Sequence, residues 1–338
     1  MQKIIESVPN FSEGRDQAVI DAIAGAIASV EGVQVLHVDP GEAANRTVIT
    51  FVGPPEAVAE GAFRGAAMAK ERIDMRVHTG EHPRIGATDV LPLVPVAGVS
   101  LEECATLARA LAERMFRELG IPCYCYEAAA FRPERKRLEV CRAGEYEGLR
   151  EKMADPERRP DFSDGWTEAA ARSGASVVGA RNFLIAVNFN LDSADAEAAG
   201  EVARDVRESG RKGPDGRRIP GLLKGCKAIG WYIEEYGIAQ VSMNITDMDA
   251  TPLHVAFETV RKAAAARGLR VTGTEIIGLV PERVLLEAGL YFRQQRGLPA
   301  DAEREELVRL AVEAFALDDL RPFDPWEKVI EYRMENKC

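Results

Sequence analysis

The spacing of hydrophobic and polar positions predicts alternating strands and helices over the first 96 residues. Residues 4–11 have the pattern of a short strand that ends in a turn. Residues 16–30 have that of an amphipathic helix, with apolar residues at helical spacing at Val19, Ile20, Ile23, Ile27 and Val30. Two strands, a helix and a further strand follow at 33–38, 47–51, 55–71 and 88–96. The predicted order of elements is βαββαβ.

The same order of elements recurs in residues 181–282. Strands are predicted at 183–189, 227–233, 239–245 and 271–280, with helices at 194–209 and 252–267. Short sequences recur too, since Val8-Pro9-Asn10-Phe11 matches Val187-Asn188-Phe189, and residues 88–95 match residues 274–281. We therefore predict an α+β protein of duplicated ferredoxin-like α/β sandwich subdomains. Each would be an antiparallel sheet covered by helices on one face, with a cleft where the two meet.

The predicted domains are residues 1–180, 181–297 and 298–338. In the first domain, residues 97–180 add a long helix at 101–119, a strand at 122–126 and a basic turn at 132–137. Residues 298–338 are charged and are predicted to form a helical C-terminal tail. Apolar positions in the tail suit docking on the body of the protein or on a partner subunit: Leu307, Leu310, Ala311 and Val312.

Composition and charge narrow the class of protein. The 338 residues are 46% hydrophobic and 29% charged, as in ordinary soluble proteins, and the net charge of −11 argues against a nucleic-acid partner. No apolar run approaches the roughly 18 residues of a membrane span, and the first residues lack a secretory signal. We therefore expect no membrane partner and a cytoplasmic location. The six cysteines lack paired metal spacing, so reduced thiols are expected rather than disulfides or zinc sites.

Residues 77–90 hold the densest group of side chains suited to proton transfer. They contain two of the chain's four histidines, His78 and His82, and are interrupted by two glycines and a proline. These interruptions forbid a regular helix, so the polar side chains project from an ordered loop that leads into the strand at 88–96. We interpret this loop as a candidate active site; the alternative is a surface turn with incidental histidines. A zinc site is the weaker interpretation. The spacing of His78 and His82 suits a metal pair on a helix, but the glycines and the proline make a helix unlikely here.

A set of short motifs carries a resemblance to a known family. The motifs are Val8-Pro-Asn-Phe-Ser-Glu-Gly14, Asn45-Arg-Thr47, Gly80-Glu-His-Pro-Arg84 with Gly86 and Asp89, Gly179-Ala-Arg-Asn-Phe183, Ala228-Ile-Gly-Trp231 and Gln240-Val-Ser242. In these motifs the chain resembles the glutamate formimidoyltransferases, which form the formiminotransferase domain of the formiminotransferase-cyclodeaminases. The resemblance covers nearly all of residues 1–300. It implies two ferredoxin-like subdomains that enclose folate between them, and a homodimer.

The resemblance also implies an activity. Proteins of this family move the formimino group of N-formimino-L-glutamate to N5 of tetrahydrofolate, in histidine degradation, and use no metal. The catalytic histidine would be His82, with His78 as its neighbour. Folate contacts would lie between 161 and 174, where the chain keeps Asp161, Phe162 and Gly174. Because the sequence ends without residues for a cyclodeaminase domain, we expect it to perform the transfer alone, beside a separate cyclodeaminase.

Formimino transfer needs a group that takes a proton from the attacking nitrogen and returns it to the leaving nitrogen. An imidazole with a pKa near the working pH does both, so His82 is the candidate acid/base. Asp39 could hold the imidazole tautomer, or could be an ordinary turn aspartate. Both substrates carry carboxylates, which require cationic partners. Arg84 beside His82 is the leading candidate, with a surface ion pair as its alternative role, and Arg46 and Arg181 are further candidates.

The remaining candidates concern the folate. Amide side chains at strand ends could bind the pterin ring or could cap turns: Asn10, Asn188, Asn190 and Gln240. The basic segment 211–218, too glycine-rich for regular structure, could be a mobile flap for a polyglutamyl tail on tetrahydrofolate or simply a solvated linker. Other functions stay open at this point. They are a formyltransferase acting on N-formylglutamate or 5-formyltetrahydrofolate, a non-catalytic folate-binding protein, and a metal-dependent hydrolase.

Overall fold

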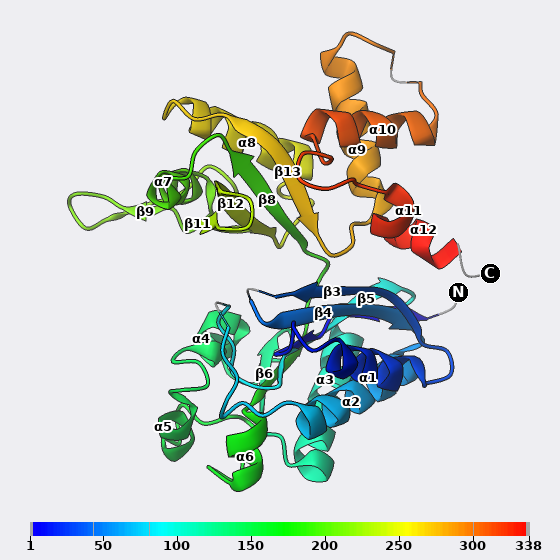
Figure 1. The fold of residues 1–338 in the computed structure, drawn as a ribbon, viewed down its shortest axis with the longest axis vertical. Helices are drawn as coiled ribbons and strands as arrows, with labels where there is room; N and C mark the ends of the chain where they lie inside the picture. Colours follow the sequence, from blue (N-terminus) through cyan, green and yellow to red (C-terminus); the bar gives the residue numbers. More distant parts are fainter. Residues whose placement is uncertain (1–2, 43, 81, 300, 336–338) are drawn as a thin grey trace. The chain divides into compact units, whose positions relative to one another are not determined.

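The chain folds into two compact units, Met1–Asn182 and Phe183–Cys338 (Figure 1). The structure, a computed structural model, describes residues 3–42, 44–80, 82–299 and 301–335. The division lies two residues from the predicted boundary at 180, and residues 298–338 lie within the second unit. Each unit is described by itself below.

The first unit contains the predicted βαββαβ element as an antiparallel sheet. β1 (Ile4–Ser7) and β2 (Asn10–Phe11) lie end to end between β4 and β5, because both pair with both neighbours. The strand order is β3, β4, β1 with β2, then β5, and the bounds are β3 (Gln34–Gly41), β4 (Arg46–Gly53) and β5 (Thr88–Ala97). Helices α1 (Gln17–Ala28) and α2 (Pro55–Arg72) bury their apolar faces on one side of this sheet. The predicted strand at 4–11 is thus interrupted at Val8-Pro9.

Two parallel strands extend this sheet beyond its ferredoxin-like part. β7 (Ser176–Ala180) pairs with β5, and β6 (Cys123–Glu127) pairs with β7. The helix α3 (Leu101–Leu119) begins with a capping box of Ser100 and Glu103 and ends at Gly120 in the left-handed conformation. β7 was not predicted; its five residues, Ser-Val-Val-Gly-Ala, are wholly buried and show no alternation. Short helices complete the connector: η1 (Pro133–Lys136), α4 (Leu138–Arg142), α5 (Leu149–Ala154) and α6 (Glu168–Ser173).

The second unit repeats the strand order of the first. Its four-stranded antiparallel sheet has the order β11 (Cys226–Ile233), β12 (Ile238–Ile245), β8 (Ile185–Leu191), β13 (Val271–Ile277). Helices α7 (Ala196–Val206) and α8 (Leu253–Ala265) pack on one face. Since both sheets run second, third, first, fourth strand, the predicted duplicated α+β fold is confirmed.

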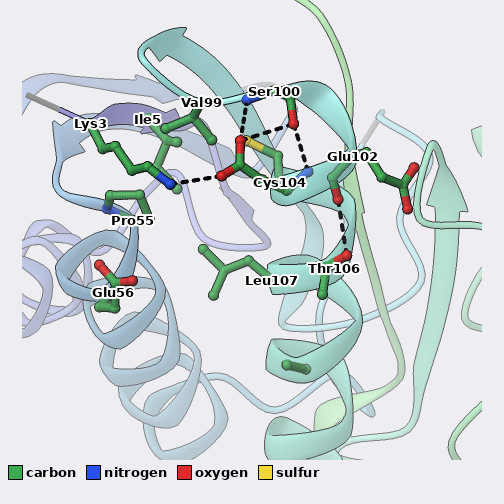
Figure 2. A pocket seen from close by; sticks show the side chains of 12 residues that line it. Lys3, Ile5, Pro55, Glu56, Val99, Ser100, Glu102, Cys104, Thr106 and Leu107 are labelled. Atoms are coloured by element: carbon green, nitrogen blue, oxygen red, sulfur yellow. Dashed lines mark hydrogen bonds and ion pairs between the residues drawn. The ribbon is translucent and has the colours of Figure 1, made fainter. Parts of the chain in front are cut away.

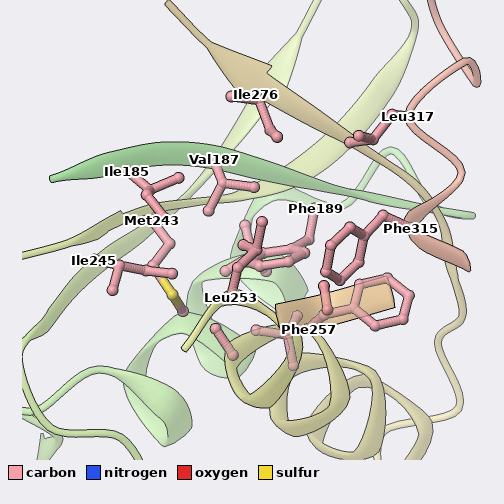
Figure 3. Close-up of a cluster of buried hydrophobic side chains, with 14 of the residues drawn as sticks. Ile185, Val187, Phe189, Met243, Ile245, Leu253, Phe257, Ile276, Phe315 and Leu317 are labelled. Carbon is pink, nitrogen blue, oxygen red and sulfur yellow. The ribbon is translucent and has the colours of Figure 1, made fainter. Parts of the chain in front are cut away.

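The C-terminal helices contribute to the core of the second unit. Phe315 packs edge-on to Phe257 with ring centroids 5.2 Å apart, and both belong to the cluster around Phe189 (Figure 3). Of the tail positions predicted to dock, Leu310 and Ala311 are buried. Helix α9 was not predicted, and it precedes the tail helices: α9 (Glu282–Gln295), α10 (Arg304–Phe315), α11 (Pro325–Lys328) and α12 (Ile330–Glu335).

The expectation that the basic segment 211–218 has no regular structure was wrong. Instead, β9 (Arg211–Lys212) pairs with β10 (Arg218–Ile219) as a two-stranded hairpin. Gly216, at a φ of 76°, supplies the turn. The hairpin is stabilised at its base, because Arg211 forms an ion pair with Asp205 and Arg218 Nε donates to Ser209 O at 2.6 Å.

Two further expectations concern cysteines and membrane spans. The five cysteines within the described residues are buried and free, as predicted: Cys104, Cys123, Cys125, Cys141 and Cys226. Burial raises the pKa of each of these thiols. Among the helices of the described residues, none is both long and apolar enough to cross a bilayer.

Candidate active site

The histidine loop, residues 77–87, is fixed by close backbone packing against the segment before β7. Gly86 and Gly174 form an antiparallel bridge. A Cβ on Gly86 would lie 2.2 Å from Ala175 O, and one on Gly174 would lie 2.3 Å from Ile85 O, so neither position has room for a side chain. The N–H groups of Ala87 and Ala175 donate across this contact at 2.8 and 3.1 Å. The loop is therefore ordered by residues almost a hundred positions later in the chain.

A β-bulge directs Asp89 away from the strand ladder. Phe11 pairs with Thr88 and Asn10 pairs with Val90, so Asp89 is the extra residue on β5. Its side chain is completely buried and its Oδ1 accepts from the N–H of Ile85 at 2.9 Å. Bulges next to active sites commonly redirect a side chain in this way.

Two arginines bind the same carboxylate oxygen. Arg46 at the start of β4 forms a buried ion pair with Asp89 Oδ2, and Arg142 at the end of α4 donates to that oxygen at 2.7 Å. Burial raises the pKa of Asp89, but the guanidinium groups of Arg46 and Arg142 outweigh this and hold the pKa below its ordinary value. Arg46 Nε also donates to Asn10 Oδ1 at 3.0 Å. A buried carboxylate thus gathers two cations from distant elements at the foot of the histidine loop.

His82 is half-buried, and one of its ring nitrogens is bound. Nδ1 lies 2.7 Å from Pro83 O, which as a carbonyl oxygen can only accept, so Nδ1 carries the proton in the neutral ring. That leaves the lone pair on Nε2. Burial, followed by the positive charges of Arg46 and Arg142, lowers the pKa of His82 to about 4, with Asp89 and the Pro83 carbonyl opposing. His82 is therefore a neutral imidazole at physiological pH with Nε2 as its base.

His78 has protein partners on both ring nitrogens. Nε2 donates to Asn45 O at 3.0 Å, and Nδ1 accepts from Arg84 Nε at 3.4 Å. Burial lowers the pKa of His78 as well, with the contact to Asn45 opposing. Through these contacts His78 joins the histidine loop to the turn that precedes β4. In the part of the chain that the structure describes, no three His, Cys, Asp or Glu side chains converge as metal ligands.

Arg84 is bound to the connector. Glu147 accepts from two of its nitrogens at 2.7 and 2.8 Å, and Glu145 accepts at 3.2 Å. Its backbone carbonyl accepts from the N–H of Tyr146 at 3.0 Å. The Arg84 side chain is 9% exposed, so this bidentate pair is a partly buried clasp between the histidine loop and residues 145–147. In this structure its guanidinium holds a protein carboxylate, a different arrangement from the free carboxylate receptor that the sequence suggested.

The remaining predicted residues of the first unit fall into two groups. Asn10, Arg46 and Asp39 lie on one sheet face: Asp39 pairs with Val48, which pairs with Asn10, and cross-strand partners share a face. The position that was predicted for Asp39, at His82 Nδ1, is held by Pro83 O. Arg181 follows β7, where its N–H donates to Leu93 O at 3.1 Å.

Residues of the predicted folate segment make structural contacts. Asp161 Oδ2 accepts from the N–H of Cys125 at 2.8 Å, and its other oxygen forms a buried ion pair with Arg135. Phe162 pairs with Cys123 through two backbone hydrogen bonds and packs edge-on to Phe131. Asp161 and Phe162 therefore bind the edge strand β6, whereas Gly174 packs against the histidine loop.

The amides of the second unit are linked in a polar chain whose middle members, Gln240 and Asn190, are buried. Trp231 Nε1 donates to Gln240 Oε1 at 3.1 Å, Gln240 donates to Asn190 at 2.8 Å, and Asn190 donates to Asp319 at 3.0 Å. Asn188, two residues before Asn190 on β8, donates to Glu275 at 3.1 Å. Asn188, Asn190 and Gln240 are therefore bound to other side chains rather than capping turns.

A separate hollow lies at the other end of the first unit. It has a volume of about 460 Å³ and is lined by the starts of α2 and α3, with Lys3 and Glu103 joined across it at 2.7 Å (Figure 2). Ile5 in its wall pairs with Pro95, near the end of β5 opposite to the histidine loop. None of the predicted site residues lines this hollow.

Two residues of the site were missed from the sequence. Arg142 and Glu147 belong to the connector, where charged residues are common and no motif distinguishes these two. The one signal in the sequence was Asp89 in the apolar strand at 88–96, because a carboxylate buried there needs cationic partners. It pointed to no particular arginine, and Arg46 had been considered only as a partner for substrate carboxylates.

Comparisons with known proteins agree with the motifs. A family model described as "Formiminotransferase domain, N-terminal subdomain" matches residues 4–181, and one described as "Formiminotransferase domain" matches residues 186–335. The chain is 48% identical over 332 residues to the formimidoyltransferase-cyclodeaminase of Mus musculus, covering 98% of this chain and 60% of that protein. Relative to that protein, the chain spans less than two thirds of the length.

Two microbial relatives match over almost their whole length. The glutamate formimidoyltransferase of Streptococcus pyogenes serotype M1 is 42% identical over 294 residues, with 87% of this chain and 94% of that protein covered. The glutamate formimidoyltransferase of Thermoplasma acidophilum is 40% identical over 296 residues, with 87% and 93% covered.

Proposed function

The chain belongs to the formiminotransferase family, and from that membership we propose that it transfers the formimino group of N-formimino-L-glutamate to N5 of tetrahydrofolate. The observation that carries the proposal is His82. Its Nδ1 is bound by the Pro83 carbonyl, its pKa is lowered to about 4, and its Nε2 is left as a base. The ring is neutral and keeps a free lone pair on Nε2, as a general base requires. Its pKa is lower than the value near the working pH that was expected from the sequence, because burial and two arginines disfavour the charged ring.

The reaction needs His82 twice. N5 of tetrahydrofolate attacks the formimino carbon, a carbon–nitrogen bond forms, and Nε2 takes the proton from N5. In the tetrahedral intermediate the bond to the glutamate nitrogen then breaks, and the imidazolium returns the proton to that nitrogen. A lowered pKa makes the imidazolium a stronger acid for the second step, so the charges that weaken the base favour departure of glutamate.

The candidate arginines differ in the protein carboxylates that already bind them. Arg84 is held by Glu147 and Glu145, so we assign it to loop geometry near His82. Arg46 is the better candidate for a substrate carboxylate, because it shares Asp89 with a second arginine. Arg181, Asp161 and Phe162 stay predictions as folate contacts, as does Asp39 as a partner of the imidazole.

Further parts of the proposal concern partners and location. We propose that tetrahydrofolate is the cosubstrate in a polyglutamylated form and that the chain acts as a homodimer in the cytoplasm. We further propose that residues 298–338 are a helical tail that packs on the second unit. The fused cyclodeaminase in the name of the mouse relative supports a separate cyclodeaminase beside this chain. The formyl-group alternative differs from the formimino substrate at one atom.

An assay with purified protein tests the proposal. Tetrahydrofolate is incubated with N-formimino-L-glutamate or with N-formyl-L-glutamate, and 5-formiminotetrahydrofolate or 5-formyltetrahydrofolate is measured by chromatography. We expect turnover with the formimino donor only. Turnover with the formyl donor alone would make the chain a formyltransferase, and tight folate binding with no turnover of either donor would make it a binding protein.

A further inference from the structure

The cluster around Asp89 holds more positive than negative charge. Two guanidinium groups, that of the buried Arg46 and that of Arg142, whose side chain is 14% exposed, share one carboxylate, and both contact the same oxygen, Oδ2. The other oxygen, Oδ1, is bound by the neutral N–H of Ile85, and Arg46 Nε is bound by the neutral amide of Asn10. One positive charge is therefore left without a partner in a largely buried cluster, which is costly unless an anion completes it.

Arg142 also has an unused donor. Its Nε is buried and has no hydrogen-bond partner in the part of the chain that the structure describes. Two other buried arginines of the first unit differ in this respect. Arg84 is bound by two glutamates and by His78, while Arg135 is bound by Asp161 and by the carbonyls of Glu157 and Arg159. Arg267 Nε is also buried without a partner among the described residues, but of the two only Arg142 Nε lies in a cluster with an uncompensated positive charge, so an anionic ligand there would satisfy both the donor and the charge.

We propose that Arg142, together with Arg46, binds the α-carboxylate of the donor substrate next to His82. The proposal rests on the proposed function for the identity of the donor. In N-formimino-L-glutamate the α-carboxylate is one carbon away from the nitrogen that leaves, whereas the γ-carboxylate is three carbons away. Cations that flank the acid/base therefore suit the α-carboxylate. Arg142 is then a specificity-determining residue contributed by the connector helix α4.

The bound carboxylate also changes the charge that His82 experiences. The groups that act on the imidazole are Arg46 from β4, Arg142 from α4, Asp89 from β5 and the Pro83 carbonyl of its own loop. In the free protein the two arginines lower the pKa of His82, and a carboxylate bound to them offsets this charge. Substrate binding consequently raises the pKa of His82. The acid limb of kcat, which reports the substrate complex, should then lie at higher pH than the acid limb of kcat/KM, which reports the free protein.

Two substitutions and a control test the role of Arg142. Arg142→Met should raise the KM for N-formimino-L-glutamate about 10–100-fold, because it removes a charge-assisted pair, while the KM for tetrahydrofolate changes less than about threefold. It should also move the acid limb of kcat/KM to higher pH, since a positive charge beside His82 is lost. Arg142→Lys, which keeps the charge but loses the fork, should give an intermediate KM. Arg137→Met, at the residue directly before α4 and 67% exposed, removes the same charge away from the site and should change neither value.

Binding measurements separate this inference from the proposed function. N-acetyl-L-glutamate and N-acetyl-L-isoglutamine, which has an amide in place of the α-carboxylate, are titrated calorimetrically into the wild-type protein and the variants. We expect the wild type to favour the α-carboxylate by at least about tenfold and Arg142→Met to lose this preference. If that holds without formimino transfer, the proposed function fails and the site stands. If transfer occurs but Arg142→Met keeps its KM and its preference, or if the wild type shows no preference, the inference is overturned.

Discussion

The two units share one sheet order but carry different polar chemistry at equivalent positions. Asn10 in the first unit corresponds to Asn188 in the second by their common sequence, and Arg46 and Gln240 each stand two residues before the cross-strand partner of that asparagine. In the first unit the arginine contacts a buried aspartate and a second arginine. In the second unit the glutamine contacts Asn190, and the chain of neutral amides ends at Asp319.

The difference arises from one bulge and one insertion. β13 pairs with β8 without interruption from Thr274 to Ile277, whereas β5 is bulged at Asp89 opposite Asn10 and Phe11. The connector then brings Arg142 to the displaced carboxylate. The same scaffold therefore carries a charged cluster in one unit, where a bulge and the connector meet, and a chain of hydrogen-bonded amides in the other.

The largest effect is expected at the histidines. His82→Ala should lower turnover about 10²–10⁴-fold and leave tetrahydrofolate binding within a few-fold, because a proton shuttle acts in the transition state. The matched control is His254→Ala in the second unit, a partly buried histidine stacked on Tyr291 with ring centroids 4.6 Å apart. Steady-state kinetics and folate titration measure both. Similar losses from the two substitutions would remove the distinction between the units.

The buried Asp89 of the first unit should contribute more to stability than Glu275 of the second unit. Asp89→Asn leaves the buried Arg46 and the largely buried Arg142 without a countercharge and should lower the free energy of unfolding by about 3–5 kcal/mol. Glu275→Gln keeps an acceptor for Asn188 and should change it by less than about 1 kcal/mol. Urea unfolding monitored by circular dichroism measures both. An effect of Glu275→Gln as large as that of Asp89→Asn would contradict the electrostatic account.

The contribution of Asp89 to the free energy of unfolding has a defined pH dependence. The folded-state pKa of Asp89 lies below its unfolded value of about 4, so its contribution to stability is present above about pH 4 and is lost as the pH falls through the folded-state pKa. The difference in unfolding free energy between the wild type and Asp89→Asn should therefore be constant near pH 7 and shrink below about pH 4. A difference that grows with acidity would refute the assigned direction of the shift.

A smaller effect is expected from the backbone contact under the histidine loop. Gly174 has a φ of 66° and a ψ of −152°, a region open almost only to glycine, and a Cβ there would strike Ile85 O. Gly174→Ala should lower the free energy of unfolding by about 3 kcal/mol and lower kcat, since the loop must move. Gly278→Ala in the second unit, with a φ of 72° and no atom within 4 Å, carries the backbone strain alone and should cost about 1–2 kcal/mol with unchanged kcat.

The smallest effect is expected at the basic hairpin of the second unit. Arg211 and Arg218 are already bound at its base, so Lys212 and the 89%-exposed Arg217 are the cations at its tip that face solvent. Replacing both with glutamine should weaken binding of triglutamyl tetrahydrofolate by about threefold at low salt and leave monoglutamyl binding unchanged. Titrations at two ionic strengths measure this. Equal, salt-insensitive affinities for both tail lengths in the wild type would remove any role for the hairpin.

Local patterns predicted the parts of this protein that depend on local sequence. The alternation at 33–38 and the helical spacing at 16–30 identified the two repeats, because each element buries one face of its own sheet. The strand at 176–180 was missed because a wholly buried five-residue run has no period to recognise. The ion pairs of Asp89 with Arg46 and Arg142 could not be predicted, because they join residues from three elements and depend on a bulge that leaves no mark in residue type.

The bridge between Gly86 and Gly174 has a consequence during synthesis of the chain. The two residues are 88 positions apart, so the histidine loop leaves the ribosome well before the segment that orders it. At about 5–20 residues per second the interval is roughly 4–18 s. Arg142 and Glu147, whose side chains also contact the loop or its buried carboxylate, are translated only in the second half of that interval. The nascent first unit can form its βαββαβ sheet early, but it becomes competent for proton transfer only after β7 has been added.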